Sequence, residues 1–100
     1  MADIEALKAK HGKIFSLEVQ GDTFIAKNPS RDVWKRFRAQ IMDETRRVIA
    51  PENLVLACIV DPSGPELDAM LELKPGLVET LSKALAESAG ATGDAEKKAL

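Results

Sequence analysis

Residues 13–28, KIFSLEVQGDTFIAKN, decide the fold because apolar and polar residues alternate on both sides of a Gly-Asp pair. Such alternation is typical of a β-strand with one buried face. Gly21-Asp22 fits a two-residue hairpin loop with glycine first, the type II′ pattern. The loop predicts these facing pairs: Gln20 with Thr23, Val19 with Phe24, and Leu17 with Ala26. The apolar face of the hairpin then consists of Phe15, Leu17, Val19, Phe24 and Ala26.

Helices are expected to cover this face, since a two-stranded hairpin alone is only marginally stable in water. Apolar residues recur at three- and four-residue steps in four other segments, which predicts helices over residues 3–11, 31–49, 65–73 and 77–88. A fifth helix is predicted to begin at Ala50-Pro51, because proline is favoured in a first helical turn. The apolar run 54–60 that follows also suits a buried strand, which stays open as the alternative.

Local signals indicate where the helices begin and what the longest one buries. The segment Asn28-Pro29-Ser30 ends the hairpin, and Ser30 or Asn28 is expected to cap the helix over 31–49. Ser63 and Glu66 have the spacing of a capping box for the helix over 65–73. The apolar stripe of the longest helix consists of Val33, Trp34, Phe37, Ile41, Val48 and Ile49. Trp34 and Phe37 are expected to pack on the hairpin face and anchor the core.

The composition, 45% hydrophobic and 30% charged, is that of a globular domain. We predict one α+β domain over residues 1–88, with an N-terminal β-hairpin packed against helices and a mainly helical C-terminal half, then a disordered polar tail over 89–100. The sequence lacks the apolar runs of a membrane helix or a signal peptide. With one cysteine and one histidine, it excludes an internal disulfide and the usual structural zinc sites. We expect a cytoplasmic domain without metal or cofactor.

Charge divides the chain into two unlike halves. Residues 1–50 have a net charge of +3, and residues 51–100 have a net charge of −5. Six basic residues lie in the predicted helix 31–49: Arg31, Lys35, Arg36, Arg38, Arg46 and Arg47. A nucleic-acid-binding module could use them to contact phosphates, but three acidic residues share the helix and the pI is about 5.4. A solvated helix face is therefore the preferred interpretation. Arg31, Lys35, Arg36 and Arg38 remain candidates for an electrostatic partner face.

The sequence gives little support to an enzyme. Cys58 is the candidate nucleophile, but it lies inside the apolar run LVLACIV, where a thiol is expected to be buried and inert. No phosphate-binding loop, dinucleotide fingerprint or cluster of metal ligands is present. We therefore predict no catalytic residues.

The order of three short motifs resembles that of the tail assembly chaperones of tailed bacteriophages and prophages. Residues 26–31 correspond to a K/R-x-P-[ST] step from a strand pair into a helix. Residues 57–62 correspond to a segment with cysteine or an apolar residue, then valine, then x-Pro. Residues 70–77 correspond to a Leu-Leu-x-x-x-Pro-Gly-Leu stretch before a final helix. The resemblance covers residues 13–88. The chain departs from the family pattern at Asn28 and in its unusually basic central helix.

The resemblance implies a non-enzymatic assembly factor in the cytoplasm of a bacterial host. Such a protein binds the tape measure protein, and tail tube subunits, while the tail is built, and is absent from the finished particle. In this family, ribosomal frameshifting near the end of the reading frame often produces a longer product, and the polar tail after Ser88 is where such an extension would attach. We expect an apolar helix surface to bind the client: Leu67, Met70, Leu71, Leu77 and Leu81. The split charge is hypothesised to serve head-to-tail self-association. A structural tail or head–tail connector protein is a further alternative.

Overall fold

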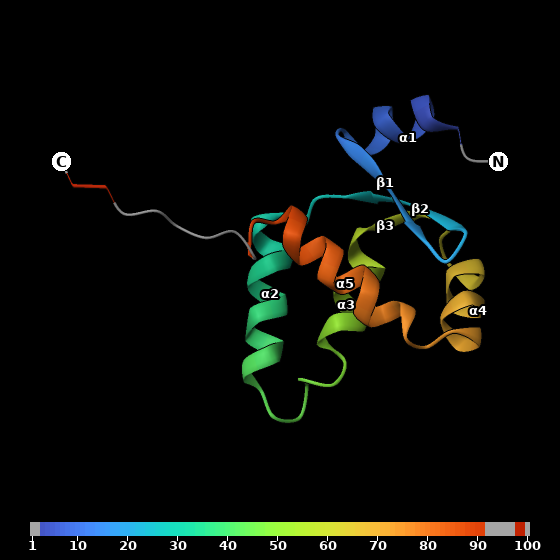
Figure 1. The fold of residues 1–100 in the computed structure, drawn as a ribbon. Coiled ribbons are helices and arrows are strands. Elements are labelled where there is room, and N and C mark those ends of the chain that lie inside the picture. The colour runs from blue at the N-terminus through green and yellow to red at the C-terminus, as the bar shows by residue number, and fades with distance from the viewer. Residues whose placement is uncertain (1–2, 92–97, 100) are drawn as a thin grey trace.

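The computed structural model describes residues 3–91 and 98–99. Its elements, in chain order, are α1 (Ile4–His11), β1 (Ile14–Val19), β2 (Asp22–Lys27), α2 (Arg31–Met42), α3 (Ala50–Cys58), β3 (Ile59–Asp61), α4 (Pro65–Leu73) and α5 (Leu77–Ser88). Figure 1 shows α1 on one side of the sheet and the remaining helices on the other. The predicted α+β class is confirmed, with an N-terminal hairpin followed by mostly helical chain. Among the described residues, no helix has the length and apolarity needed to cross a bilayer.

The hairpin turns one residue earlier than predicted. Gln20 has φ 53° and Gly21 has φ 86°, so these two residues form the loop, and Asp22 already belongs to β2. Two successive positive φ values are those of a type I′ turn, whose twist matches that of the flanking strands. The observed pairs include Val19 with Asp22, Leu17 with Phe24, and Phe15 with Ala26. The predicted register was therefore wrong by two residues, but an even shift leaves the same side chains on the apolar face.

A third strand extends the hairpin into a sheet of order β1-β2-β3. The apolar run 54–60 contains both of its predicted alternatives, because α3 ends at Cys58 and the next residue begins β3. The strand β3 runs antiparallel to β2, with Ala26 opposite Ile59 and Ile25 opposite Asp61. This pairing places β2 in the centre of the sheet, and Phe24 and Ala26 are fully buried there.

The helix α2 is shorter than predicted, ending at Met42 instead of residue 49. Asp43 adopts extended backbone angles, and its carboxylate accepts hydrogen bonds from the backbone N–H of Thr45 at 2.9 Å and from Thr45 Oγ1 at 2.7 Å. An aspartate that bonds its own neighbourhood in this way competes with helix continuation. Residues 44–49 form turns, so Val48 is 86% exposed and does not extend the apolar stripe. Ile49 is exposed as well.

The start of α2 was predicted correctly, but the packing of its two aromatic residues was not. Ser30 caps it as predicted, with Oγ accepting from the Val33 N–H at 3.2 Å. Trp34 and Phe37 lie with ring centroids 5.1 Å apart, and both are only half-buried. The helix packs mainly along α3, where Phe37 lies near Leu54. The two aromatic residues therefore border the core instead of anchoring its centre on the hairpin.

The centre of the core lies between the sheet and the pair α3 and α5. Its fully buried side chains include Phe24, Val55, Leu81 and Leu85. The bounds predicted for α4 and α5 are confirmed, but the predicted capping box is not formed, because Gly64 with φ 58° precedes α4 and no side chain caps it. Residues 89–91 form a turn, and most of the predicted tail over 89–100 lies outside the described residues.

Candidate functional site

Four of the five leucine and methionine positions predicted to bind a client belong to the core. Leu67, Leu71, Leu77 and Leu81 are buried, and only Met70 keeps some exposed surface. They join α4 and α5 to the sheet and to α3 within one hydrophobic cluster. A partner cannot reach Leu67, Leu77 or Leu81 in this conformation, and Leu71 exposes only 7% of its surface, at the edge of an open cleft. The periodicity that identified them is the same for a core face and for a binding face, so it could not separate the two.

Cys58 is fully buried at the end of α3. Desolvation raises the pKa of its thiol, and the charge of Lys27 offsets this only in part. A thiol in this setting stays protonated near neutral pH, whereas a nucleophile has to form the thiolate. Within residues 3–91 and 98–99, no three His, Cys, Asp or Glu side chains are grouped so that they could hold a metal ion.

The six basic residues that the sequence placed on one long helix do not share one face of the structure. Arg31, Lys35 and Arg38 are exposed and follow one another at helical spacing, and Met42, 81% exposed, continues the same line. We call these four residues the α2 ridge. Arg36 lies on another side of α2, at the rim of a groove. Arg46 and Arg47 lie on the turn after α2, where Arg46 Nε is 3.9 Å from Asp43 Oδ2 and Arg47 Nε donates to the carbonyl of Ile41 at 2.9 Å.

The groove beside Arg36 runs between α2 and α3 and has a volume of about 280 Å³. Its apolar walls come from Val33 and Phe37 on α2 and from Leu54 and Ala57 on α3. At one place a hydrogen bond crosses between the helices, from Asn53 Nδ2 to Gln40 Oε1 at 3.4 Å. Leu56, on the outer face of α3 near the groove, is also exposed. We call this feature the α2–α3 groove. It is an open groove of mixed lining, in which Gln40 and Asn53 lie beside the apolar residues and Arg36 stands at the rim.

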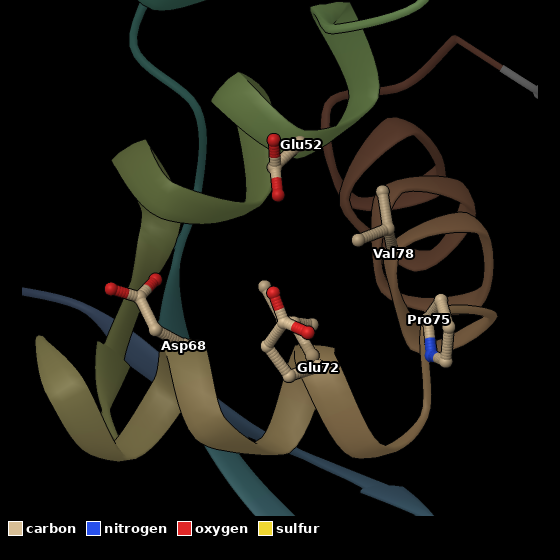
Figure 2. A pocket seen from close by; sticks show the side chains of 6 residues that line it. Glu52, Asp68, Glu72, Pro75 and Val78 are labelled. Carbon is tan, nitrogen blue, oxygen red and sulfur yellow. The ribbon is translucent and has the colours of Figure 1, made fainter.

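A second hollow of about 440 Å³ lies between α3, α4 and the start of α5, and we call it the acidic cleft. Figure 2 shows Glu52 of α3 and Glu72 of α4 pointing toward each other across it, with Asp68 at one end. Its apolar lining consists of Leu71, Pro75 and Val78. The ion pairs found among the described residues, Asp43 with Arg46 and Asp22 with Lys74, leave these carboxylates unpaired.

Sequence analysis did not identify the acidic cleft. A partial signal was present, since Asp68 and Glu72 are four residues apart and therefore share a face of α4. Glu52 comes from α3, twenty positions earlier than Glu72, and the packing of the two helices brings it to the same place. That packing follows from tertiary structure and not from any local pattern.

Comparison with known proteins identifies relatives but no activity. The model of a family described as a domain of unknown function, DUF6848, matches residues 7–98. The solved structure of an uncharacterised protein from Bacillus stearothermophilus is similar, with a TM-score of 0.80 and 26% identity over 96% of this chain and 100% of that one. No curated protein sequence matches. Because the family model spans nearly the whole chain, the protein belongs to the DUF6848 family.

Proposed function

We propose that the protein is a non-enzymatic phage tail assembly chaperone, which binds apolar segments of the tape measure protein, and tail tube subunits, in the cytoplasm of a bacterial host. The observation that carries the proposal is the α2–α3 groove, an open groove whose lining is partly apolar. A helix-binding groove of this kind suits an amphipathic client segment. Arg36 at its rim favours a client with an acidic residue beside its apolar stripe.

The three motifs that resemble the chaperone family support the proposal by their positions. Residues 26–31 make the step from β2 into α2, residues 57–62 make the step from α3 into β3, and residues 70–77 make the turn from α4 into α5. Each motif therefore lies where the chain changes direction. Motifs at such places specify the fold, so a chain that has all three in order is expected to share the family's architecture.

The absence of a reactive group in the described chain supports a binding role. Cys58 is inaccessible and its pKa is raised by burial. His11 stands at the C-terminal end of α1, beside Gly12 and far along the chain from Cys58.

Co-expression with a client tests the proposal. The protein is produced together with the amphipathic segment of the tape measure protein from the same source, and complex size is measured by size-exclusion chromatography with light scattering. We expect a soluble complex, from a client that is insoluble alone. Ala57→Gln, which extends a side chain into the groove, should weaken binding about tenfold, or about 1.4 kcal/mol. The matched control is Ala69→Gln, at an exposed position on α4, which should bind normally.

A client that stays insoluble, or equal binding by the two glutamine variants, would contradict this role for the groove. One observation favours a nucleic-acid module as the second candidate, namely that Arg31, Lys35 and Arg38 lie exposed on one line of α2. That alternative predicts retention on heparin that falls steeply with salt concentration. A structural connector would instead remain in the mature particle, where mass spectrometry would detect it.

A further inference from the structure

We infer that copies of this chain associate head to tail, with the α2 ridge of one copy seated in the acidic cleft of the next. This inference concerns the protein alone and does not depend on the proposed client. The occupant of the cleft is thus a second copy of the same chain.

The α2 ridge is a helix face that its own fold leaves without a partner. Arg31, Lys35 and Arg38 supply three cations, and Met42 follows at the end of the same line. Met42, the last residue of α2, is 81% exposed and so offers an apolar contact beside the three cations. A flexible thioether adapts readily to an irregular apolar surface. The ridge is therefore complementary to a partner surface that has carboxylates beside an apolar patch.

The acidic cleft has that composition. Glu52, Asp68 and Glu72 supply three carboxylates, and none takes part in an ion pair within the described residues. Pro75 and Val78 form an apolar part of the lining at the end away from Asp68 (Figure 2). Three cations with one apolar residue on the ridge meet three carboxylates with an apolar lining in the cleft. Pairing of this kind directs encounter and fixes the orientation of the two partners.

The two surfaces are formed by different helices, the ridge by α2 and the cleft by α3, α4 and the start of α5. Figure 1 shows α2 at one side of the molecule and α4 at the other, with α3 and α5 between them. One copy can therefore use its ridge and its cleft at the same time, with different neighbours. Contacts between unlike surfaces produce rings or open filaments instead of symmetric dimers. The net charge of −2 is small enough that copies do not strongly repel one another as a whole.

Two charge reversals test the contact in the full chain. Lys35→Glu disables the ridge and leaves the cleft intact, and Glu72→Lys disables the cleft and leaves the ridge intact. Sedimentation velocity over a range of protein concentrations is the assay. We expect the wild type to grow in mass with concentration at about 0.05 M salt and to dissociate at about 0.5 M, since exposed charges are screened there. Each reversal should weaken association at least about tenfold.

A mixture of the two variants gives the sharpest result. The intact ridge of Glu72→Lys can bind the intact cleft of Lys35→Glu, but neither end of that pair can grow further. The mixture should therefore stop at a one-to-one dimer, although each variant alone is monomeric. Lys83→Glu and Glu87→Lys are the matched controls, because they reverse exposed charges on α5 outside both surfaces. They should assemble as the wild type does.

Three results would overturn the inference: a wild type that stays monomeric at low salt, variants that assemble as well as the controls, or a mixture that stays monomeric. All the altered side chains are exposed, and circular dichroism checks that each variant keeps its fold. Client binding by Lys35→Glu is measured separately. Loss of self-association with client binding retained would separate the ridge from the α2–α3 groove.

Discussion

Truncating Leu81 tests the placement of the α5 leucines in the core. The structure buries this side chain completely, where it packs in the cluster between α5, α3 and the sheet. Leu81→Ala removes about three buried methylene equivalents, worth about 0.8 kcal/mol each, or about 2.4 kcal/mol. The cavity left behind adds to that loss, so we expect the free energy of unfolding to fall by about 3 kcal/mol. In a domain of this length the melting temperature should fall by about 15 °C.

The chain offers both an internal reporter and a matched control. Trp34 is the single tryptophan and is half-buried, so its fluorescence follows unfolding in urea. Leu73→Ala makes the same chemical change at the end of α4, where the side chain is 80% exposed. Its free energy of unfolding should change by less than about 0.5 kcal/mol.

The difference between the stability losses of Leu81→Ala and Leu73→Ala decides whether Leu81 belongs to the core. If Leu81 belonged to a free binding face, its truncation would cost little stability and would act only on partner binding. A loss below about 1 kcal/mol for Leu81→Ala, or equal losses for both variants, would refute the placement of this leucine in the core. Urea melts followed at 222 nm should agree with the tryptophan signal if unfolding is two-state.

Three further predictions concern the turns and the buried thiol. Gln20→Gly should stabilise the fold by about 0.5 kcal/mol in urea melts, because Gln20 has a positive φ; no gain would favour the type II′ turn instead. Hydrogen bonds from Thr45 lower the pKa of the Asp43 carboxyl, so its contribution to stability is present above the ordinary pKa of 3.8 and is lost as the pH falls through the lower folded value. Carbon-13 NMR should show that pKa rising toward 3.8 in Thr45→Val, and an unchanged value would contradict the assigned cause. Cys58 should resist a thiol reagent in the native protein and react in urea, and rapid native labelling would show that the thiol is accessible.

The elements that the sequence predicted well are those set by local chemistry. The helix predicted over residues 3–11 is observed as α1 over Ile4–His11, with Asp3 as its cap and Gly12 directly after its end. The helix α5 begins after the Lys74-Pro75-Gly76 break, because caps and breakers act within a few residues. The apolar face of the hairpin was also predictable, since a period of two survives a shift of two residues. These signals do not depend on what the rest of the chain does.

The errors arise where two local solutions compete or where distant residues meet. Gln20-Gly21 and Gly21-Asp22 both suit a two-residue hairpin loop, and the chain adopts the first. The alternation of apolar residues could not separate them, because both loops leave the same side chains on the apolar face. The sequence pattern placed Asp43 inside the helix over 31–49. In the structure its carboxylate accepts hydrogen bonds from Thr45, and the helix ends before it. The acidic cleft has only the Asp68 and Glu72 spacing as a sequence pattern, and the α2–α3 groove has none, because each is built by helices that meet only in the folded protein.

The direct passage from α3 into β3 gives the sheet a mechanical link to the acidic cleft. Ile59 follows the last residue of the helix and already pairs with Ala26 of the central strand, so no loop absorbs a movement of α3. Glu52 stands near the other end of the same helix, at the cleft. If a second copy binds at Glu52 as inferred above, a movement of α3 would reach the short β2–β3 pairing, whose register is irregular between Ile25 and Ala26. We therefore expect occupation of the cleft to change the amide hydrogen exchange of Ile25 and Ala26, which pair with β3 at the end of α3 opposite Glu52.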